Sequence, residues 1–239
     1  MLGIQMMITQ RPKAQIIRRA FTLAEVLITL GIIGVVAAIT IPTLIQNSQK
    51  QETVTRLQKA YSTITQAYKN AEITMGSGAN WGEPTTEGDI IASATWWNTY
   101  FLPYSNLSII KTCTGSISID SECWASDSIF LDGASFGLTA ALLYIILKDG
   151  TTLYLNRTYN DYALIYVDIN GLKKPNVVGK DIFFMTLWYK AGYLGFSGQG
   201  SSRTSLLGNC SRSSGPGRGS YCGAIIQIDG WQIKDDYPW

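Results

Sequence analysis

The sequence contains no histidine and few charged residues. Histidine is the commonest general base and a frequent metal ligand, so its absence excludes Ser-His-Asp and Cys-His catalytic sites, histidine-bound zinc and an imidazole pH switch. Charged residues make up 15% of the 239 residues, below the usual quarter, whereas the hydrophobic fraction of 46% is normal for a folded protein. This composition favours a folded domain attached to a membrane segment, and we predict that the protein is not an enzyme.

The formal charge of +2 is unevenly distributed along the chain. Residues 1–20 carry four basic side chains and no acidic one. The rest of the chain holds fifteen basic and seventeen acidic side chains, a balance of −2. The basic residues of the first segment are Arg11, Lys13, Arg18 and Arg19. The excess of positive charge is therefore confined to a short basic leader.

A long apolar segment follows the leader. Residues 21–45 contain one ionisable side chain, Glu25, and about 20 apolar residues are enough to cross a bilayer core. Basic residues precede this segment and no comparable cluster directly follows it, which places the N-terminus in the cytoplasm and the remaining chain outside. We therefore predict a single-pass membrane protein. Cleavage as a secretory signal near Ala37-Ala38 is an alternative, although a signal sequence normally has a shorter apolar run.

The junction between leader and apolar segment consists of two arginines, Ala20, Phe21 and, four residues later, Glu25. This pattern resembles the N-terminal segment of type IV prepilins and type II secretion pseudopilins. The resemblance implies that a prepilin peptidase cuts between Ala20 and Phe21 and methylates the new amine of Phe21. Ala20 stands where the family generally has glycine. The resemblance also implies an inner-membrane location, with the folded domain in the periplasm or outside the cell.

Two residues of the apolar segment have predicted roles in assembly. A carboxylate inside an apolar span costs a few kcal/mol and usually has a partner. The resemblance implies that Glu25 pairs with the Phe21 amine of a neighbouring subunit; alternatively, Glu25 lies close enough to the membrane face to reach water or headgroups. Pro42 lacks the N–H that would bond to Ala38, so we expect a kinked or locally loosened helix there.

The sequence after the apolar segment predicts one long helix followed by a mixed domain. Apolar residues recur every three or four positions through residues 46–78, which indicates an amphipathic continuation of the helix to Gly76 and Gly78. Residues 79–239 alternate between apolar runs and turns, as in a domain of strands. The candidate strands are 138–147, 151–155, 162–169 and 181–189, with a late strand at 225–228. The predicted fold is α+β and pilin-like, with one long N-terminal helix packed on an antiparallel sheet of about four strands.

All four cysteines lie in the part that we place outside the cytoplasm, where disulfides persist. Four cysteines allow three pairings, and proximity in the sequence favours Cys113 with Cys123 and Cys210 with Cys222. Neither spacing resembles the Cys-x-x-Cys units of zinc or redox sites. We therefore predict structural disulfides.

The loop between the last two of the four candidate strands has two interpretations. Asn170-Gly171 is a turn signal. Some pseudopilins bind calcium in a loop rich in Asp and Gly at a comparable place, and here Asp168, Asn170 and Asp181 offer oxygen ligands. Three nearby lysines oppose a cation, and the spacing differs from that of the helix-loop-helix calcium loop. We favour a structural turn, with a calcium site as the alternative, and we predict no other cofactor.

Two further segments have competing interpretations. Residues 197–221 are rich in Ser and Gly and contain three arginines, which favours a mobile solvated loop over a surface for DNA or an acidic partner. An aromatic cluster precedes the first cysteine. Such side chains usually pack in a core or an interface, and a carbohydrate or adhesion surface is the alternative. The cluster consists of Trp96, Trp97, Tyr100, Phe101 and Tyr104.

The sequence thus predicts a structural subunit of a type II secretion pseudopilus or a type IV pilus. The partners implied by the resemblance are pilin-like subunits in a filament, prepilin peptidase and an inner-membrane assembly platform, with no requirement for nucleic acid. The alternative is a membrane-anchored minor pilin that acts as a binding module for DNA, a surface or a secreted substrate.

Overall fold

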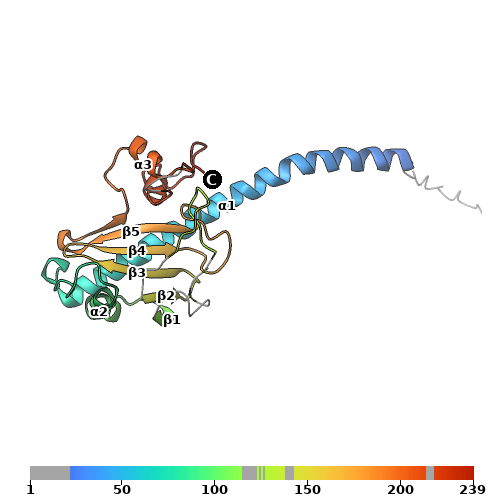
Figure 1. Ribbon diagram of the computed structural model, residues 1–239. Coiled ribbons are helices and arrows are strands. Elements are labelled where there is room, and N and C mark those ends of the chain that lie inside the picture. Colours follow the sequence, from blue (N-terminus) through green and yellow to red (C-terminus); the bar gives the residue numbers. More distant parts are fainter. Residues whose placement is uncertain (1–21, 115–122, 124, 126, 138–142, 214–217) are drawn as a thin grey trace, which may run out of the picture. The chain divides into compact units, whose positions relative to one another are not determined.

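The computed structural model describes residues 22–114, 123, 125, 127–137, 143–213 and 218–239 (Figure 1). The chain divides into two compact units, residues 1–46 and residues 47–239. In the described part of the chain, the second unit holds every strand and every helix except the first part of helix α1.

Helix α1 runs from Leu23 to Met75. It ends before Gly76, whose φ of 79° is the left-handed conformation that commonly terminates helices. The expected long helix with an end near Gly76 is therefore confirmed. Within the second unit, its buried positions recur at spacings of three and four along one stripe. These residues are Thr53, Leu57, Ala60, Ile64, Ala67, Tyr68 and Ala71.

The described strands form one antiparallel sheet of six strands in sequence order. They are β1 (Ile109–Thr114), β2 (Leu143–Leu147), β3 (Thr152–Thr158), β4 (Ala163–Asp168), β5 (Ile182–Trp188) and β6 (Tyr193–Phe196). The second part of α1 crosses one face of this sheet (Figure 1), and the core between them contains Ile64, Ile145 and Val167 without exposed surface. The α+β fold is confirmed.

The four main candidate strands correspond to β2, β3, β4 and β5, and residues 138–142 of the first candidate lie outside the described residues. The Asp149-Gly150 turn joins β2 to β3, and Gly150 has the positive φ of 86° that such a turn requires. The expected number of about four strands is too small, because β1 and β6 extend the sheet at its two edges. Strand β6 has four residues, too few for a clear period, and the register of β1 shifts between Ile109 and Lys111, which interrupts its alternation.

The described residues also contain three short α-helices and three 3₁₀ turns. The helices are α2 (Ile90–Tyr100), α3 (Arg203–Asn209) and α4 (Cys222–Ile228), and the turns are Gly78–Asn80, Leu102–Tyr104 and Tyr189–Ala191. The late strand expected at 225–228 is wrong, because this segment belongs to α4. Ile225 and Ile226 are fully buried in the core, so tertiary packing overrides the strand preference of these β-branched residues.

The segment 197–221 is more structured than a mobile loop. It contains α3, whose Leu206 is 1% exposed, and the Cys210–Cys222 disulfide joins the segment to α4. Its three arginines are engaged within the chain. Arg203 forms ion pairs with Asp229 and Asp236 at 2.7 Å each, Arg218 with Asp132 at 3.1 Å, and Arg212 donates a hydrogen bond to Trp239 O at 2.5 Å. The expected loop is therefore wrong for the described part of this segment.

The aromatic cluster packs in the core. Trp96, Trp97 and Phe101 are each no more than 2% exposed, and they lie on α2 or at its end. The core interpretation of this cluster is confirmed. The other disulfide joins Cys113 to Cys123, so both pairs are those that proximity in the sequence favours.

Candidate functional site

Helix α1 begins with a capping box formed by Thr22 and Glu25. Glu25 Oε2 accepts hydrogen bonds from Thr22 N and Thr22 Oγ1, both at 2.8 Å, and Thr22 Oγ1 accepts one from Glu25 N at 3.2 Å. This exchange satisfies N–H groups that have no partner in the first turn of a helix. The Thr-x-x-Glu signature is visible in the sequence, and it gives Glu25 a structural role that its apolar surroundings did not reveal.

The residues after this cap expose large apolar side chains on all sides of the helix. Among the described residues, α1 is the one helix long and apolar enough to cross a membrane by length and composition. Glu25 is its only ionisable side chain up to Ile45. A helix that is apolar all round fits a membrane anchor. The exposed side chains are Leu23, Val26, Leu27, Ile28, Leu30, Ile32, Ile33, Val35, Val36, Ile39, Ile41, Leu44 and Ile45.

The remaining N-terminal predictions concern the cleavage position and the proline. Ala20 and Phe21 lie outside the described residues. Pro42 lies inside α1, and the residues on both sides of it are helical. Cleavage and methylation at Phe21, and the kink at Pro42, therefore stay predictions.

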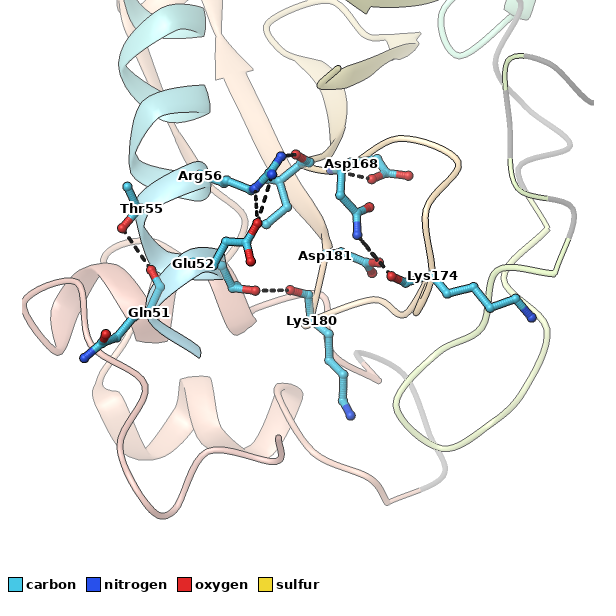
Figure 2. Close-up of polar contacts among 11 residues, drawn as sticks. Gln51, Glu52, Thr55, Arg56, Asp168, Lys174, Lys180 and Asp181 are labelled. Atoms are coloured by element: carbon cyan, nitrogen blue, oxygen red, sulfur yellow. Dashed lines mark hydrogen bonds and ion pairs between the residues drawn. The ribbon is translucent and has the colours of Figure 1, made fainter. Parts of the chain in front are cut away.

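The loop between β4 and β5 brings the three candidate calcium ligands together, and Figure 2 shows two of them, Asp168 and Asp181. Asp168 Oδ1 accepts hydrogen bonds from Asn170 N at 3.1 Å and from Gly171 N at 2.8 Å. Asn170 Nδ2 donates to Asp181 Oδ2 at 3.2 Å. The sequence therefore identified residues that converge in space, and the contacts show what holds them.

Backbone N–H groups already occupy most of the carboxylate oxygens. Asp181 Oδ1 accepts from Val177 N at 2.6 Å, and Asp181 Oδ2 accepts from Asn176 N at 2.7 Å. Two buried oxygens, Asn170 Oδ1 and Asn176 Oδ1, have no hydrogen-bond partner and are the ones that a cation could still use. The described residues contain no group of three His, Cys, Asp or Glu side chains arranged for a metal. This geometry favours the structural turn, and the calcium site stays a prediction.

Asp168 and Asp181 are almost completely buried, at 0% and 1% exposure. Burial raises the pKa of the Asp168 carboxyl well above its usual range, and the charge of Asp181 raises it further. Burial also raises the pKa of Asp181, although the N–H groups of Val177 and Asn176 oppose this increase. The two carboxyls therefore retain a proton at pH values where an exposed aspartate is ionised.

A cleft of about 490 Å³ lies between this loop and α1 within the second unit. Thr53 Oγ1 donates to Lys180 O at 3.3 Å, which ties α1 to the loop. Arg56 bonds to Glu52 at 2.9 Å and reaches Ile169 O at 3.5 Å (Figure 2). The cleft is lined by basic, acidic and polar side chains together with Ile169, Pro175 and Trp239.

One protein-family model matches residues 43–239, which include the whole sheet and this cleft. The chain belongs to this family of unknown function, DUF6613. No curated protein and no solved structure matches the chain. The DUF6613 match contains all four cysteines and the Asp168–Asp181 network, whereas Glu25 and Pro42 precede it.

Asp168 in this DUF6613 region provides a test by pH. A carboxyl whose folded-state pKa is raised contributes stability at low pH that is lost as the pH rises from about 4, the unfolded value, through the folded value. Asp168→Asn keeps an oxygen that accepts from the N–H groups of Asn170 and Gly171. Because an amide does not ionise, this variant does not lose stability at residue 168 as the pH rises. We expect its free energy of unfolding to rise relative to that of the parent between pH 4 and pH 7, and this difference to grow with the pH.

Urea denaturation of the full chain in detergent at several pH values measures this difference. The exposed carboxylates titrate in both proteins and cancel in the comparison. Asp235→Asn, at an exposed position, controls for the lost charge. A difference between Asp168→Asn and the parent that stays constant from pH 4 to pH 7 would contradict the raised pKa.

Proposed function

We propose that the chain is a structural subunit of a type II secretion pseudopilus or a type IV pilus, cut between Ala20 and Phe21 and assembled through α1. The observation that carries this proposal is the division of α1 itself. Its first part is apolar all round with one carboxylate in the first turn, and its second part is amphipathic and packs on an antiparallel sheet. The first part suits a lipid anchor and helix-to-helix contacts, and the second holds the folded domain.

Glu25 supplies the specific contact in this proposal. Among the described residues, its carboxylate accepts hydrogen bonds from Thr22 and has no cationic partner. Cleavage before Phe21 creates an amine four residues away in the sequence, and the same amine on a neighbouring copy can pair with Glu25. An ion pair of this kind is far stronger in an apolar environment than in water.

The proposed location is the inner membrane, with a single span, a cytoplasmic N-terminus and the folded domain in the periplasm or outside the cell. The basic leader supports this orientation. The two disulfides support an oxidising compartment for the domain. The proposed partners are other pilin-like subunits, prepilin peptidase and the inner-membrane assembly platform, and we propose no enzymatic activity.

The alternative, a minor pilin that binds DNA, has less support. The cations that would contact DNA in this alternative are the three arginines of segment 197–221. These arginines already bind groups of the same chain. A phosphate backbone would have to displace these contacts.

Mass spectrometry of the protein from the membrane fraction tests the processing step. We expect a mature chain that begins with N-methylated Phe21, because the peptidase removes the basic leader. Ala20→Glu places a bulky charge before the cut, and this variant should retain Met1. A parent chain that begins at Met1, or after Ala38, would contradict the proposal.

A further inference from the structure

The two ends of the sheet carry opposite charges. Strand β4 leads from Ala163 at one end to Asp168 at the other, so the loops before and after it lie at opposite ends. The end before β4 has three exposed carboxylates, and the end after it has a group of exposed or half-buried cations. We name them the acidic end (Glu83, Glu87 and Asp161) and the basic end (Lys173, Lys174, Lys180 and Arg212).

The acidic end is held together by contacts between loops. Asn160 Nδ2 donates to Glu87 Oε2 at 3.4 Å, and Gly88 N donates to Thr158 O at 2.9 Å. Figure 1 shows α2, which follows Gly88, at this end of the sheet. Within the described residues, none of the three carboxylates of the acidic end forms an ion pair. Two cations lie at this end: Lys190 donates to the carbonyl oxygens of Ala79 and Trp81, and Arg157 lies next to Thr158 on β3.

Aromatic rings lie beside these carboxylates. The rings of Tyr159 and Tyr162 stack with centroids 4.6 Å apart, and Trp188 follows at 4.7 Å from Tyr162. Trp188 is 38% exposed, which is unusual for so large an apolar side chain. Aromatic faces and carboxylates together form a surface suited to lysine and arginine side chains.

The basic end has more positive charge than its own acids compensate. Lys174 pairs with Asp127 at 3.0 Å but remains 80% exposed, and Arg212 donates to Trp239 O at 2.5 Å. Within the described residues, Lys173 and Lys180 form no ion pair, and Asp181 is buried among backbone N–H groups. Figure 2 shows the Lys174 and Lys180 side chains extending away from the turn. Burial lowers the pKa of Lys180, the nearby charge of Arg212 lowers it further, and the charge of Asp181 opposes this decrease.

Both ends are fixed to the same stretch of α1. Thr53 contacts the loop of the basic end, and the helix ends at Met75, next to the segment that leads to the acidic end. These 22 steps at 1.5 Å place the two ends roughly 33 Å apart along the helix. A contact between unlike ends is heterologous, so each copy leaves one end of each kind free for the next copy, and the contact builds an open filament wherever the rotation between copies does not close a ring.

We propose that the acidic end of one copy binds the basic end of the next copy, head to tail. Carboxylates of the acidic end pair with lysines of the basic end, and the exposed rings receive the lysine stems. This inference rests on the proposed function and deepens it, because it names the contact that the folded domains make in the filament.

Charge reversal tests this contact on the full chain in detergent. One variant reverses the basic end (Lys173→Glu with Lys174→Glu), one reverses the acidic end (Glu87→Lys with Asp161→Lys), and a third carries all four substitutions. Sedimentation velocity measures self-association at low salt and at about 1 M salt, where the screening length is about 3 Å. We expect each reversal to weaken self-association at least about tenfold, and we expect high salt to weaken self-association of the parent by a similar factor. The variant with all four substitutions should regain the self-association of the parent, because its two ends again carry opposite charges.

The controls separate this contact from the rest of the proposal. Asp235→Lys changes an exposed charge outside the acidic end and should associate like the parent. All variants keep α1, so their differences report on the folded domain. Association that is unchanged by both reversals, or that stops at a dimer, would overturn the head-to-tail contact. If filament formation still depended on Glu25 in that case, the proposed function would remain supported without the head-to-tail contact. If a chain that retains Met1 associated in a charge-dependent way, the head-to-tail contact would be supported but the proposed processing would not.

Discussion

Glu25→Gln is expected to abolish incorporation into filaments, whereas Thr22→Ala is expected to leave incorporation nearly unchanged. Glutamine retains an oxygen for Thr22 N and fits the capping box, but it carries no charge. The amine of a neighbouring Phe21 would then be buried without its partner, which costs about 3–5 kcal/mol for a broken buried pair. Such a loss at every contact lowers assembly by more than about a hundredfold.

The threonine variant makes the opposite change. Thr22→Ala removes the reciprocal bond with Glu25 N, at a cost of about 1 kcal/mol to the start of the helix, and retains the carboxylate. Comparing the sheared filament fraction with the membrane fraction by immunoblot measures incorporation, and mass spectrometry confirms that each variant is processed. If Thr22→Ala lost assembly while Glu25→Gln assembled normally, Glu25 would serve the helix cap and not the proposed pairing.

The elements that sequence patterns predicted are those with a strong local period. Helix α1 combines an apolar run with a stripe at spacings of three and four, and both signals persist over many turns. Strands β2 and β3 flank an Asp-Gly turn, which is specific because few residues tolerate a positive φ at that position. Local chemistry alone decides these elements, so the sequence is sufficient to find them.

The elements that patterns missed depend on contacts between distant residues. Arg203 orders the late segment by pairing with Asp229 and Asp236, which lie 26 and 33 residues away. The run Ile225–Ile228 has strand propensity but forms a helix, because the disulfide and the core fix its neighbours. A composition rich in Ser and Gly did not reveal these long-range partners.

The candidate site shows the same division. Spacing and residue type were enough to expect that Asp168, Asn170 and Asp181 converge. They did not reveal that backbone N–H groups point at both carboxylates, or that Asn170 presents its nitrogen to Asp181. The directions in which these N–H groups and the Asn170 amide point follow from the conformation of the loop. A sequence pattern does not show that conformation, so the structure was needed to favour the turn over the cation site. At the start of α1, the sequence carries the capping-box pattern Thr-x-x-Glu, so the role of Glu25 in the cap follows from local sequence alone.

Trp97→Ala is expected to have the largest effect on stability. Trp97 has no exposed surface, donates a hydrogen bond from Nε1 to Asn156 O at 2.8 Å, and packs with ring centroids 5.1 Å from Trp96 and 5.3 Å from Phe101. Truncation leaves a large cavity and an unpaired carbonyl oxygen, so we expect the free energy of unfolding to fall by about 3–5 kcal/mol. Urea denaturation followed by circular dichroism measures this loss.

Two variants of the same helix separate the causes of that loss. Trp97→Phe keeps much of the volume but removes the donor to Asn156, so its cost should lie between that of Trp97→Ala and zero. Asn98→Ala changes an exposed neighbour and should alter stability by no more than about 0.5 kcal/mol. Trp97 joins α2 to β3. If Trp97→Ala lowered the free energy of unfolding by as little as Asn98→Ala, α2 would not pack on the sheet. The acidic end would then lack the packed helix that the head-to-tail contact requires.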